Sequence, residues 1–317
     1  MPPEFLDGLY TWVRDTRLGE ITLIQANIYR IFLQSQLFLF LTILAPLCYM
    51  LFAESDRENT PRIWLLLSLS ALFASLSRSF WLALLITGVL VLAEIVRRRT
   101  WKTLLSRTAD VVALTIAGLA LLWVLVALPI SSVPGAGIFG SVMKGRATTT
   151  SDTAIDSRNL LLDPMLEQVW QAPLAGSGLG TTVTYTTKDQ RYIDNNGTDQ
   201  VTTYAFEWGW IDLVIKFGLV GTLIFIWFGL LVLKDLWTAS QQDKPRAWLY
   251  LTVLFALIAL VITHFFSPYL NHPLGWAFLA LAVGLLPRES QQVTEDDEEA
   301  TASLSLPAAL PTARDSG

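Results

Sequence analysis

Charged residues are scarce in this chain of 317 residues. Lys, Arg, Asp and Glu make up 15% of the sequence, whereas hydrophobic residues make up 53% and the mean hydropathy is +0.48. A soluble domain carries roughly 25% charged residues and cannot bury so large an apolar share. The composition therefore excludes an ordinary soluble domain and predicts an all-α, polytopic helical membrane protein.

Residues that bind metals or form cross-links are also scarce. The chain has one cysteine, Cys48, and two histidines, His264 and His272. A single cysteine excludes a disulfide framework and a thiolate metal cluster. The histidines are not spaced as a metal pair, and the sequence has neither a Walker loop nor an outer Asp-x-Asp element. We therefore expect no metal site and no cofactor.

Apolar runs dominate what remains, and they set the expected domain organisation. The runs cover residues 37–53, 63–77, 80–96, 111–130, 211–233, 247–266 and 273–287. They predict about seven transmembrane helices in one membrane domain, residues 1–288. Residues 289–317 are rich in Glu, Asp, Ser, Thr, Pro and Ala, and we expect them to form a disordered acidic tail.

Basic residues in the short links set the expected orientation. The links after the third and fifth runs carry Arg97, Arg98, Arg99, Lys102 and Arg107, and Lys234, Lys244 and Arg246. Such links face the cytoplasm, which places the tail inside and residues 131–210 outside, as one large extracytoplasmic loop. The same count places the amino terminus outside without a signal peptide, and we interpret this as a sign that upstream spans are missing.

One arginine stands inside the apolar stretch 63–96, in Ser77-Arg78-Ser79. The stretch is long enough for two short spans, so Arg78 is predicted at the turn of a helical hairpin near the outer surface. A guanidinium there needs an anion, which is the first indication of phosphate chemistry. Arg30, before the first span, falls on the same side and is either another phosphate contact or an interfacial anchor.

The outer loop contains an amphipathic pattern from Leu160 to Trp170, preceded by Arg158. Its apolar residues recur at helical spacing, with Asp163 and Glu167 on the opposite side. The pattern predicts a short helix lying along the membrane face. Pro173 ends it, and a turn follows that contains Gly176, Gly178 and Gly180. The exposed amides of such a turn can approach an anion, but the glycines also fit a plain helix stop.

Glu207 stands among aromatic residues, next to Phe206 and Trp208. An apolar setting makes a carboxylate a better proton acceptor, so Glu207 is the candidate general base. The alternative is that Glu207 only orients the start of the following helix, where a negative charge is favourable. Asp212 and Lys216 lie four residues apart and are expected to form a structural ion pair.

The order of these motifs resembles the O-antigen ligase and polysaccharide polymerase family of bacterial membrane glycosyltransferases. The matching pieces are Ser77-Arg78-Ser79, Arg158 with the helix 160–170, the turn 173–180, Gly218-Leu-Val-Gly221 and the segment 267–275. Their order and expected topology extend over about residues 20–287.

The resemblance implies transfer of a glycan from an undecaprenyl-diphosphate carrier to an acceptor sugar hydroxyl, without a metal or a nucleotide sugar. The reaction is expected on the outer face of the bacterial cytoplasmic membrane, in surface polysaccharide (exopolysaccharide) biosynthesis. The implied partners are the undecaprenyl-diphosphate-linked glycan, membrane lipid, a glycan acceptor and polysaccharide assembly proteins. Nucleic acid is not an expected partner.

The resemblance also implies roles for single residues. Arg78, Arg158 and Arg30 are expected to hold the donor diphosphate, because a planar guanidinium binds phosphate through two hydrogen bonds. Ligases of the family carry a histidine eleven residues before the glycine that corresponds to Gly218, and this chain has Glu207 there. The departure favours a repeat-unit polymerase over a ligase. Further candidate substrate contacts are Gly176, Gly178, Gly180 and His272.

Other interpretations stay open at this point. One is an O-antigen ligase acting on a lipid acceptor, and another is an inactive, truncated member of the family. A third is a fragment of a secondary transporter, in which Arg78 and Glu207 are intramembrane charges on a substrate path. The sequence has no two corresponding halves with broken helices, which disfavours the transporter.

Overall fold

The computed structural model describes residues 18–25, 28–53, 59–98, 101–127, 153–188, 197–204 and 206–287, with residues 8, 9, 12, 13, 16 and 193. The chain divides into two units, Met1–Leu286 and Pro287–Gly317, and the elements below belong to the first. The predicted tail, 289–317, lies outside the described residues, as does much of the predicted outer loop before residue 153.

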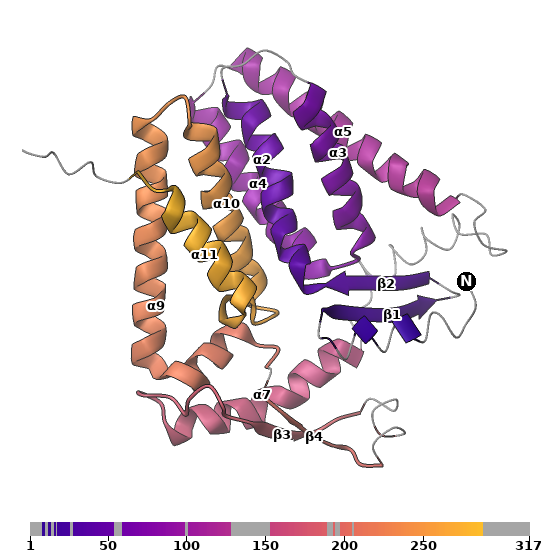
Figure 1. Cartoon of the computed structure of the whole chain (residues 1–317), viewed down its shortest axis with the longest axis vertical. Coiled ribbons are helices and arrows are strands. Elements are labelled where there is room, and N and C mark those ends of the chain that lie inside the picture. The colour runs from indigo at the N-terminus through magenta and orange to yellow at the C-terminus, as the bar shows by residue number, and fades with distance from the viewer. Residues whose placement is uncertain are drawn as a thin grey trace, which may run out of the picture. The chain divides into compact units, whose positions relative to one another are not determined.

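Helices occupy every apolar run that the sequence predicts (Figure 1). They are α2 (Leu39–Phe52), α3 (Asn59–Ala74), α4 (Arg78–Arg98), α5 (Trp101–Ala127), α7 (Thr153–Gln171), α9 (Gly209–Gln242), α10 (Ala247–His264) and α11 (Pro273–Leu285), with 3-10 turns η1 (Gln34–Phe38) and η2 (Tyr269–Asn271). The prediction of an all-α polytopic membrane protein is confirmed.

Four helical segments are long and apolar enough to cross a membrane. These are Gln34–Phe52, Arg78–Arg98, Gly209–Gln242 and Ala247–His264. Two shorter apolar helices, Thr108–Val124 and Pro273–Leu285, fall in two more of the predicted runs. The number of about seven spans stays a prediction.

Two small antiparallel hairpins were not predicted. Strands β1 (Gly19–Gln25) and β2 (Ile28–Leu33) pair before the first span, and β3 (Val183–Thr186) pairs with β4 (Gln200–Thr203) after α7. Arg30 lies in β2, opposite Thr22 of β1. The signal for the first hairpin was present, because two runs rich in β-branched and aromatic residues are separated by only two residues.

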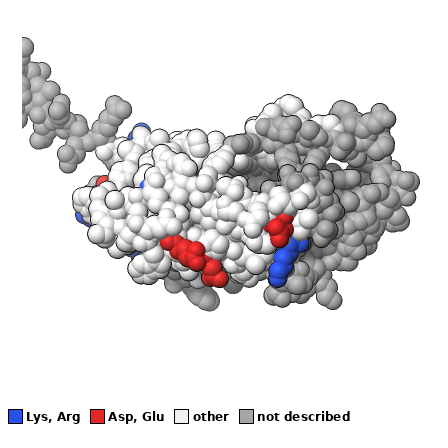
Figure 2. Space-filling view, turned by 90° about the horizontal axis from the view of Figure 1, so that it is seen from below, with Lys and Arg blue, Asp and Glu red and all other residues white. Residues whose placement is uncertain are grey.

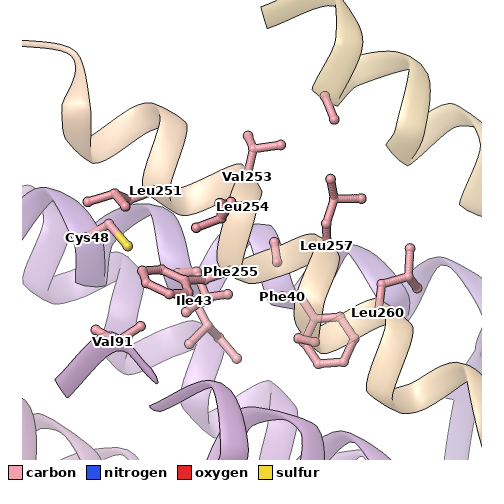
Figure 3. Packing of buried hydrophobic residues seen from close by; sticks show 14 of the residues in the cluster. Phe40, Ile43, Cys48, Val91, Leu251, Val253, Leu254, Phe255, Leu257 and Leu260 are labelled. Carbon is pink, nitrogen blue, oxygen red and sulfur yellow. The ribbon is translucent and has the colours of Figure 1, made fainter. Parts of the chain in front are cut away.

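Helix α10 forms the centre of the bundle and packs against α2, α4 and α9. A helix that is apolar on all sides is expected to be buried, and 13 of the 18 residues of α10 are buried. Figure 3 shows Leu254, Leu257 and Leu260 of α10 beside Phe40 and Cys48 of α2. The central helix therefore determines how its neighbours are placed.

Helix α9 is broken at Gly218, which has φ 67° and ψ 178°. The 34 residues of α9 would measure about 51 Å as one straight helix, longer than a bilayer core of about 30 Å. The part after the break, residues 219–242, is about 36 Å long and suffices to span the membrane. The turns before the break run at an angle to it (Figure 1).

The helices α2, α4, α9 and α11 begin at the same end of the bundle. The ring of Phe80 in α4 lies 4.9 Å from that of Phe40 in α2, and the ring of Tyr269 before α11 lies 5.9 Å from Phe80. Asn271 bonds to Asp212 near the start of α9. We call this the loop end, and it comprises residues 75–80, 173–180, 206–212 and 265–272.

The opposite end collects positive charge. Arg98 at the end of α4 donates to the carbonyl and hydroxyl of Ser240 near the end of α9, at 3.1 and 3.0 Å. Its guanidinium also lies 6.0 Å from the ring centroid of Phe52, at the end of α2. We call this the basic end, and define it by Arg62, Arg97, Arg98, Lys244 and Arg246.

Candidate functional site

Arg78 lies at the turn of a helical hairpin, as predicted, because α3 ends at Ala74 and α4 begins at Arg78. The turn is held by short polar side chains. The Ser75 hydroxyl donates to the Leu72 carbonyl at 2.6 Å, and the Ser77 amide donates to the Ser75 hydroxyl at 3.3 Å. These bonds satisfy groups at the end of α3 and leave Arg78 half-buried in the first turn of α4.

Phe80 fixes this turn against three other segments. Its fully buried ring lies 6.0 Å from that of Phe32 in β2 and 4.9 Å from that of Phe40 in α2. The ring of Tyr269 in η2 lies 5.9 Å away. The start of α4 therefore lies beside the strand that carries Arg30 and beside the segment that precedes His272.

The predicted amphipathic helix is present as α7, which begins earlier than the sequence indicated, at Thr153. Leu161 and Met165 pack on Phe206 and Ile215 in a second hydrophobic cluster, separate from the central core. Arg158 lies in α7, and its side chain is outside the described residues. Because Phe206 belongs to this cluster, the packing of α7 also places the neighbouring residue Glu207.

The glycine turn closes the break in α9. The amides of Ser177 and Gly178 donate to the carbonyls of Ile215 and Lys216, at 2.7 and 3.1 Å. On the other side of the break, the amides of Leu219 and Val220 donate to the carbonyls of Pro173 and Leu174, at 2.9 and 3.3 Å. A break in a helix leaves backbone carbonyls before it and backbone amides after it without helical partners. The turn 173–178 bonds to two such carbonyls and two such amides.

This contact requires glycine on both sides. Gly176 and Gly218 have φ values of 74° and 67°, and a Cβ on Gly218 would lie 2.1 Å from the Leu174 carbonyl oxygen. The amide of Gly176 donates to Ala172 at 2.9 Å, which is the helix stop that the sequence offered as an alternative. The amides of Gly176 and Gly178 are thus engaged within the protein. Substrate contact by Gly176, Gly178 and Gly180 stays a prediction, and for the first two it must use other atoms.

Glu207 is half-buried in the bend immediately before α9. Its neighbour Phe206 is fully buried, and the Lys216 ammonium lies 5.4 Å from the Phe206 ring centroid. The first turn of α9 closes with a bond of 2.8 Å from the Asp212 amide to the Trp208 carbonyl. Glu207 is therefore attached on one side to the α7 cluster and on the other to α9.

A buried polar chain links this helix start to the segment before α11. Lys216 Nζ lies 2.7 Å from Asp212 Oδ1, which confirms the predicted ion pair. Asn271 donates to the other carboxylate oxygen of Asp212. Asp212 is fully buried and the Lys216 side chain is 10% exposed. Asn271 is not among the predicted site residues, and its place in the segment 267–275 is the only signal for it in the sequence.

His264 belongs to a buried contact between α9 and α10. It is fully buried, and its Nδ1 accepts a bond of 3.2 Å from the amide of Leu270, so the proton lies on Nε2. A Cβ on Gly209 would lie 2.1 Å from the His264 carbonyl oxygen. The start of α9 and the end of α10 are in direct backbone contact at this point.

His272 caps α11. Its Nδ1 accepts a bond of 3.2 Å from the Leu274 amide, and Pro273 occupies the first helical position. Partial burial lowers the pKa of His272 below its usual value, because burial penalises the charged imidazolium. The capping bond needs an unprotonated Nδ1, so both effects favour the neutral ring. Substrate contact by His272 stays a prediction.

Residues 63–226 match the family model of the O-antigen ligases. The match covers just over half of the chain, and it contains Arg78, Arg158 and Glu207. The chain belongs to the O-antigen ligase family. This family consists of glycosyl-transferring membrane enzymes that act on lipid-linked glycans. The search of curated proteins gives no match to the chain.

Arg78, the glycine turn, Glu207 and His272 belong to the loop end. Arg30 and Arg158 belong to β2 and α7, which contact the loop end through Phe32 against Phe80 and through Leu161 and Met165 against Phe206. The start of α4 reaches η2 through Phe80 and Tyr269, and η2 reaches α9 through Asn271 and Asp212. Among the described residues, no group of three or more His, Cys, Asp or Glu side chains is arranged to hold a metal ion. Helices α2, α4, α9 and α11 begin at the loop end, where the positive ends of their dipoles favour anions, and α3 and α10 end there.

Proposed function

We propose that this member of the O-antigen ligase family transfers a glycan from an undecaprenyl-diphosphate carrier to an acceptor sugar hydroxyl, as a repeat-unit polymerase. One observation supports the proposal above the others. The segments that carry Arg78, Arg158 and Glu207 lie far apart in the sequence. The starts of α4 and α9 are joined through η2, and α7 packs on Phe206, next to Glu207. All three residues fall within the segment that matches the family.

The donor side of the proposed site consists of arginines. Arg78, Arg158 and Arg30 bind the diphosphate, because a guanidinium is always charged and can donate two parallel hydrogen bonds to phosphate oxygens. When the bond between the sugar and the diphosphate breaks, negative charge grows on the departing oxygen. The arginines, together with the helix starts, stabilise that charge.

The acceptor side depends on Glu207. Its carboxylate takes the proton from the acceptor hydroxyl, and the hydroxyl oxygen forms a new bond to the anomeric carbon of the donor glycan. The old bond to the diphosphate breaks in the same step, and undecaprenyl diphosphate leaves with the electron pair. Direct displacement inverts the anomeric centre. The packing of Phe206 on α7 and the Asp212–Asn271 contact support this arrangement, since they hold both sides of Glu207.

The distribution of charge supports the proposed orientation in the membrane. Arg62, Arg97, Arg98, Lys244 and Arg246 gather at the basic end, and positive residues mark the cytoplasmic side. The loop end then faces the outside of the bacterial cytoplasmic membrane, where a lipid-linked glycan is available after it has crossed the bilayer. The directions of the described helices agree with this orientation, because α2, α4, α9 and α11 all begin at the loop end.

The test is transfer in membranes that contain the chain, supplied with a radiolabelled undecaprenyl-diphosphate oligosaccharide. A ladder of repeat units on a gel is expected. Arg158→Ala and Glu207→Gln should each lower the initial rate by 100-fold or more, on the order of the contribution of one acid–base or charge-stabilising group. Glu167→Gln, on the exposed side of α7, and Arg246→Ala, at the basic end, are the matched controls and should keep the wild-type rate.

Full activity in both Arg158→Ala and Glu207→Gln would contradict the proposed roles. Full activity in Glu207→Gln alone would remove only the base. A ligase is the second candidate, because the matching family model describes O-antigen ligases. A single shift of label onto a lipid acceptor, in place of a ladder, would establish that alternative.

A further inference from the structure

Helix α7 has a wider apolar surface than the rest of the protein covers. Successive residues of an α-helix are about 100° apart around its axis, so Leu162, Leu166 and Trp170 lie next to the stripe formed by Leu161 and Met165. Leu161 and Met165 are 2% and 0% exposed, whereas Leu166 and Trp170 are 41% and 77% exposed. The second hydrophobic cluster therefore accounts for only part of the apolar surface of α7.

The turn that follows continues this exposed surface. Leu174 and Leu179 are 63% and 67% exposed, although both belong to the turn that closes the break in α9. Single exposed apolar side chains are common on protein surfaces. A contiguous group of them instead marks a surface that is covered by a membrane or by a protein partner.

The exposed surface is continuous with the membrane-facing side of α9. The Leu174 carbonyl accepts a hydrogen bond from the Val220 amide, so the two residues are in direct contact. Leu219 and Val220 are 48% and 53% exposed and lie in a segment that is long and apolar enough to cross a membrane. Leu223, one turn further along α9, is 55% exposed. The apolar surface thus runs from the spanning helix through Leu174 to the end of α7.

Two acidic residues border this surface. Asp163 is exposed two turns before Trp170, and Glu167 is exposed about 60° farther round the helix than Trp170, away from the stripe of Leu161 and Met165. Figure 2 views the end of the molecule that carries α7 and shows few charged side chains among its described residues. An apolar side with a tryptophan and a separate polar side is the pattern of a helix that lies in the interface of a bilayer.

We propose that Leu166, Trp170 and Leu174 insert into the phospholipid bilayer at the loop end and form an interfacial anchor for α7. We favour the bilayer over a protein partner as the phase that covers this surface, because the surface is continuous with the exposed apolar side of the spanning helix α9. The anchor sets the depth of the glycine turn, and through Gly176 and Gly218 it sets the depth of the break in α9. This inference does not depend on the reaction proposed above.

The test uses variants that each gain one cysteine, which is labelled with an environment-sensitive fluorophore. Cys48 is fully buried, so the unmodified chain serves as the labelling blank. Trp170→Cys and Leu174→Cys report on the proposed anchor, and Glu167→Cys, on the polar side of α7, is the matched control. The full-length chains are labelled in detergent and reconstituted into phosphatidylethanolamine and phosphatidylglycerol vesicles, with or without lipids that carry a nitroxide near the headgroup.

At positions 170 and 174, the emission should shift to the blue and nitroxide lipids should quench it at least threefold more than at position 167. Equal emission and equal quenching at the three positions would overturn the proposal and leave a protein partner as the occupant. If one anchor variant fails to elute as a folded protein, Leu166→Cys replaces it. The readout needs no substrate, so it separates failure of the anchor from failure of the proposed reaction.

Discussion

The two ends of the bundle are held together in different ways. At the basic end, Glu94 is 4% exposed and pairs with both Arg97 and Arg98, and Arg98 continues to Ser240. At the loop end, backbone groups come into direct contact, Gly176 with Gly218 and Gly209 with His264, beside the buried side-chain contact of Asp212 with Asn271. Charged side chains that neutralise one another leave little to bind an anion. The proposed function places the substrate at the loop end, with Arg78 and Glu207 acting on it.

The comparison also shows where the protein tolerates change. A side-chain pair at the basic end can be exchanged for other residues that fill the space. A backbone contact at the loop end has no such freedom, because a Cβ at Gly218 would lie 2.1 Å from a carbonyl oxygen. We therefore expect the loop end to be the more sensitive end in both folding and activity.

Breaking the glycine contact should have the largest effect. Gly218→Ala combines a positive φ with a steric clash, and we expect a loss of more than about 3 kcal/mol, enough to prevent accumulation of folded protein. Gly229→Ala is the matched control, because a Cβ there meets nothing within 4 Å and alanine favours a helix. Size-exclusion profiles and thermal unfolding in detergent measure both. Similar melting temperatures for the two variants would contradict the comparison.

Removing the charge of Asp212 should come next. Asp212→Asn leaves the Lys216 ammonium without its partner in a nearly buried position, which costs about 3 kcal/mol. The double variant Asp212→Asn with Lys216→Met removes both charges and should recover most of the lost stability. The difference in stability between the single and the double variant, measured by thermal unfolding, gives the interaction free energy of Asp212 with Lys216. Equal instability of the single and double variants would show that the ion pair is not the cause.

At the basic end, Glu94→Gln should cost about 2 kcal/mol, less than the loss of a fully buried pair, because the Arg97 side chain is 49% exposed. Asp243→Asn is the control, since its contact with Arg246 is exposed and 3.9 Å long and should contribute less than about 0.5 kcal/mol. The transfer rate per folded molecule should not change in either variant. A specific loss of transfer in Glu94→Gln would contradict the division between the two ends.

The smallest effect expected is a pH dependence from His272. Burial lowers its pKa from the usual 6.5, so the unfolded chain binds more protons than the folded chain just below that pH. The contribution of His272 to stability is therefore complete above pH 6.5 and falls as the pH drops through the folded pKa. His272→Asn keeps a capping side chain without a titrating group. The difference in melting temperature between wild type and variant should change between pH 7.5 and 5, and a constant difference would contradict the assignment.

Much of this fold could be predicted from local sequence. Apolar runs such as 37–53 and 247–266 are too long to be anything but helices in a membrane, and they appear as Leu39–Phe52 and Ala247–His264. The hairpin turn at Arg78 and the helix before Pro173 followed from the same kind of local pattern. The β1–β2 and β3–β4 hairpins were missed, because short strands give a weak signal next to long apolar helices.

The candidate site was less accessible to sequence reasoning. Single residues such as Arg78 and Glu207 could be selected for their chemistry, and so could the ion pair of Asp212 with Lys216. The contact of Asn271 with Asp212 joins positions 59 residues apart, and no local pattern encodes such a pairing. The same holds for the amides of Ser177 and Gly178, which looked free for an anion and donate instead to the break in α9.

The sequence by itself determined the membrane class, the positions of the helices and the end at which positive charge gathers, because these depend on local hydropathy and local charge. Only the tertiary structure decided which helix starts meet, that Gly176 and Gly218 join two distant segments, and that α7 exposes Trp170. These features depend on backbone groups finding partners across the fold, where water is absent and an unpaired amide or carbonyl is costly.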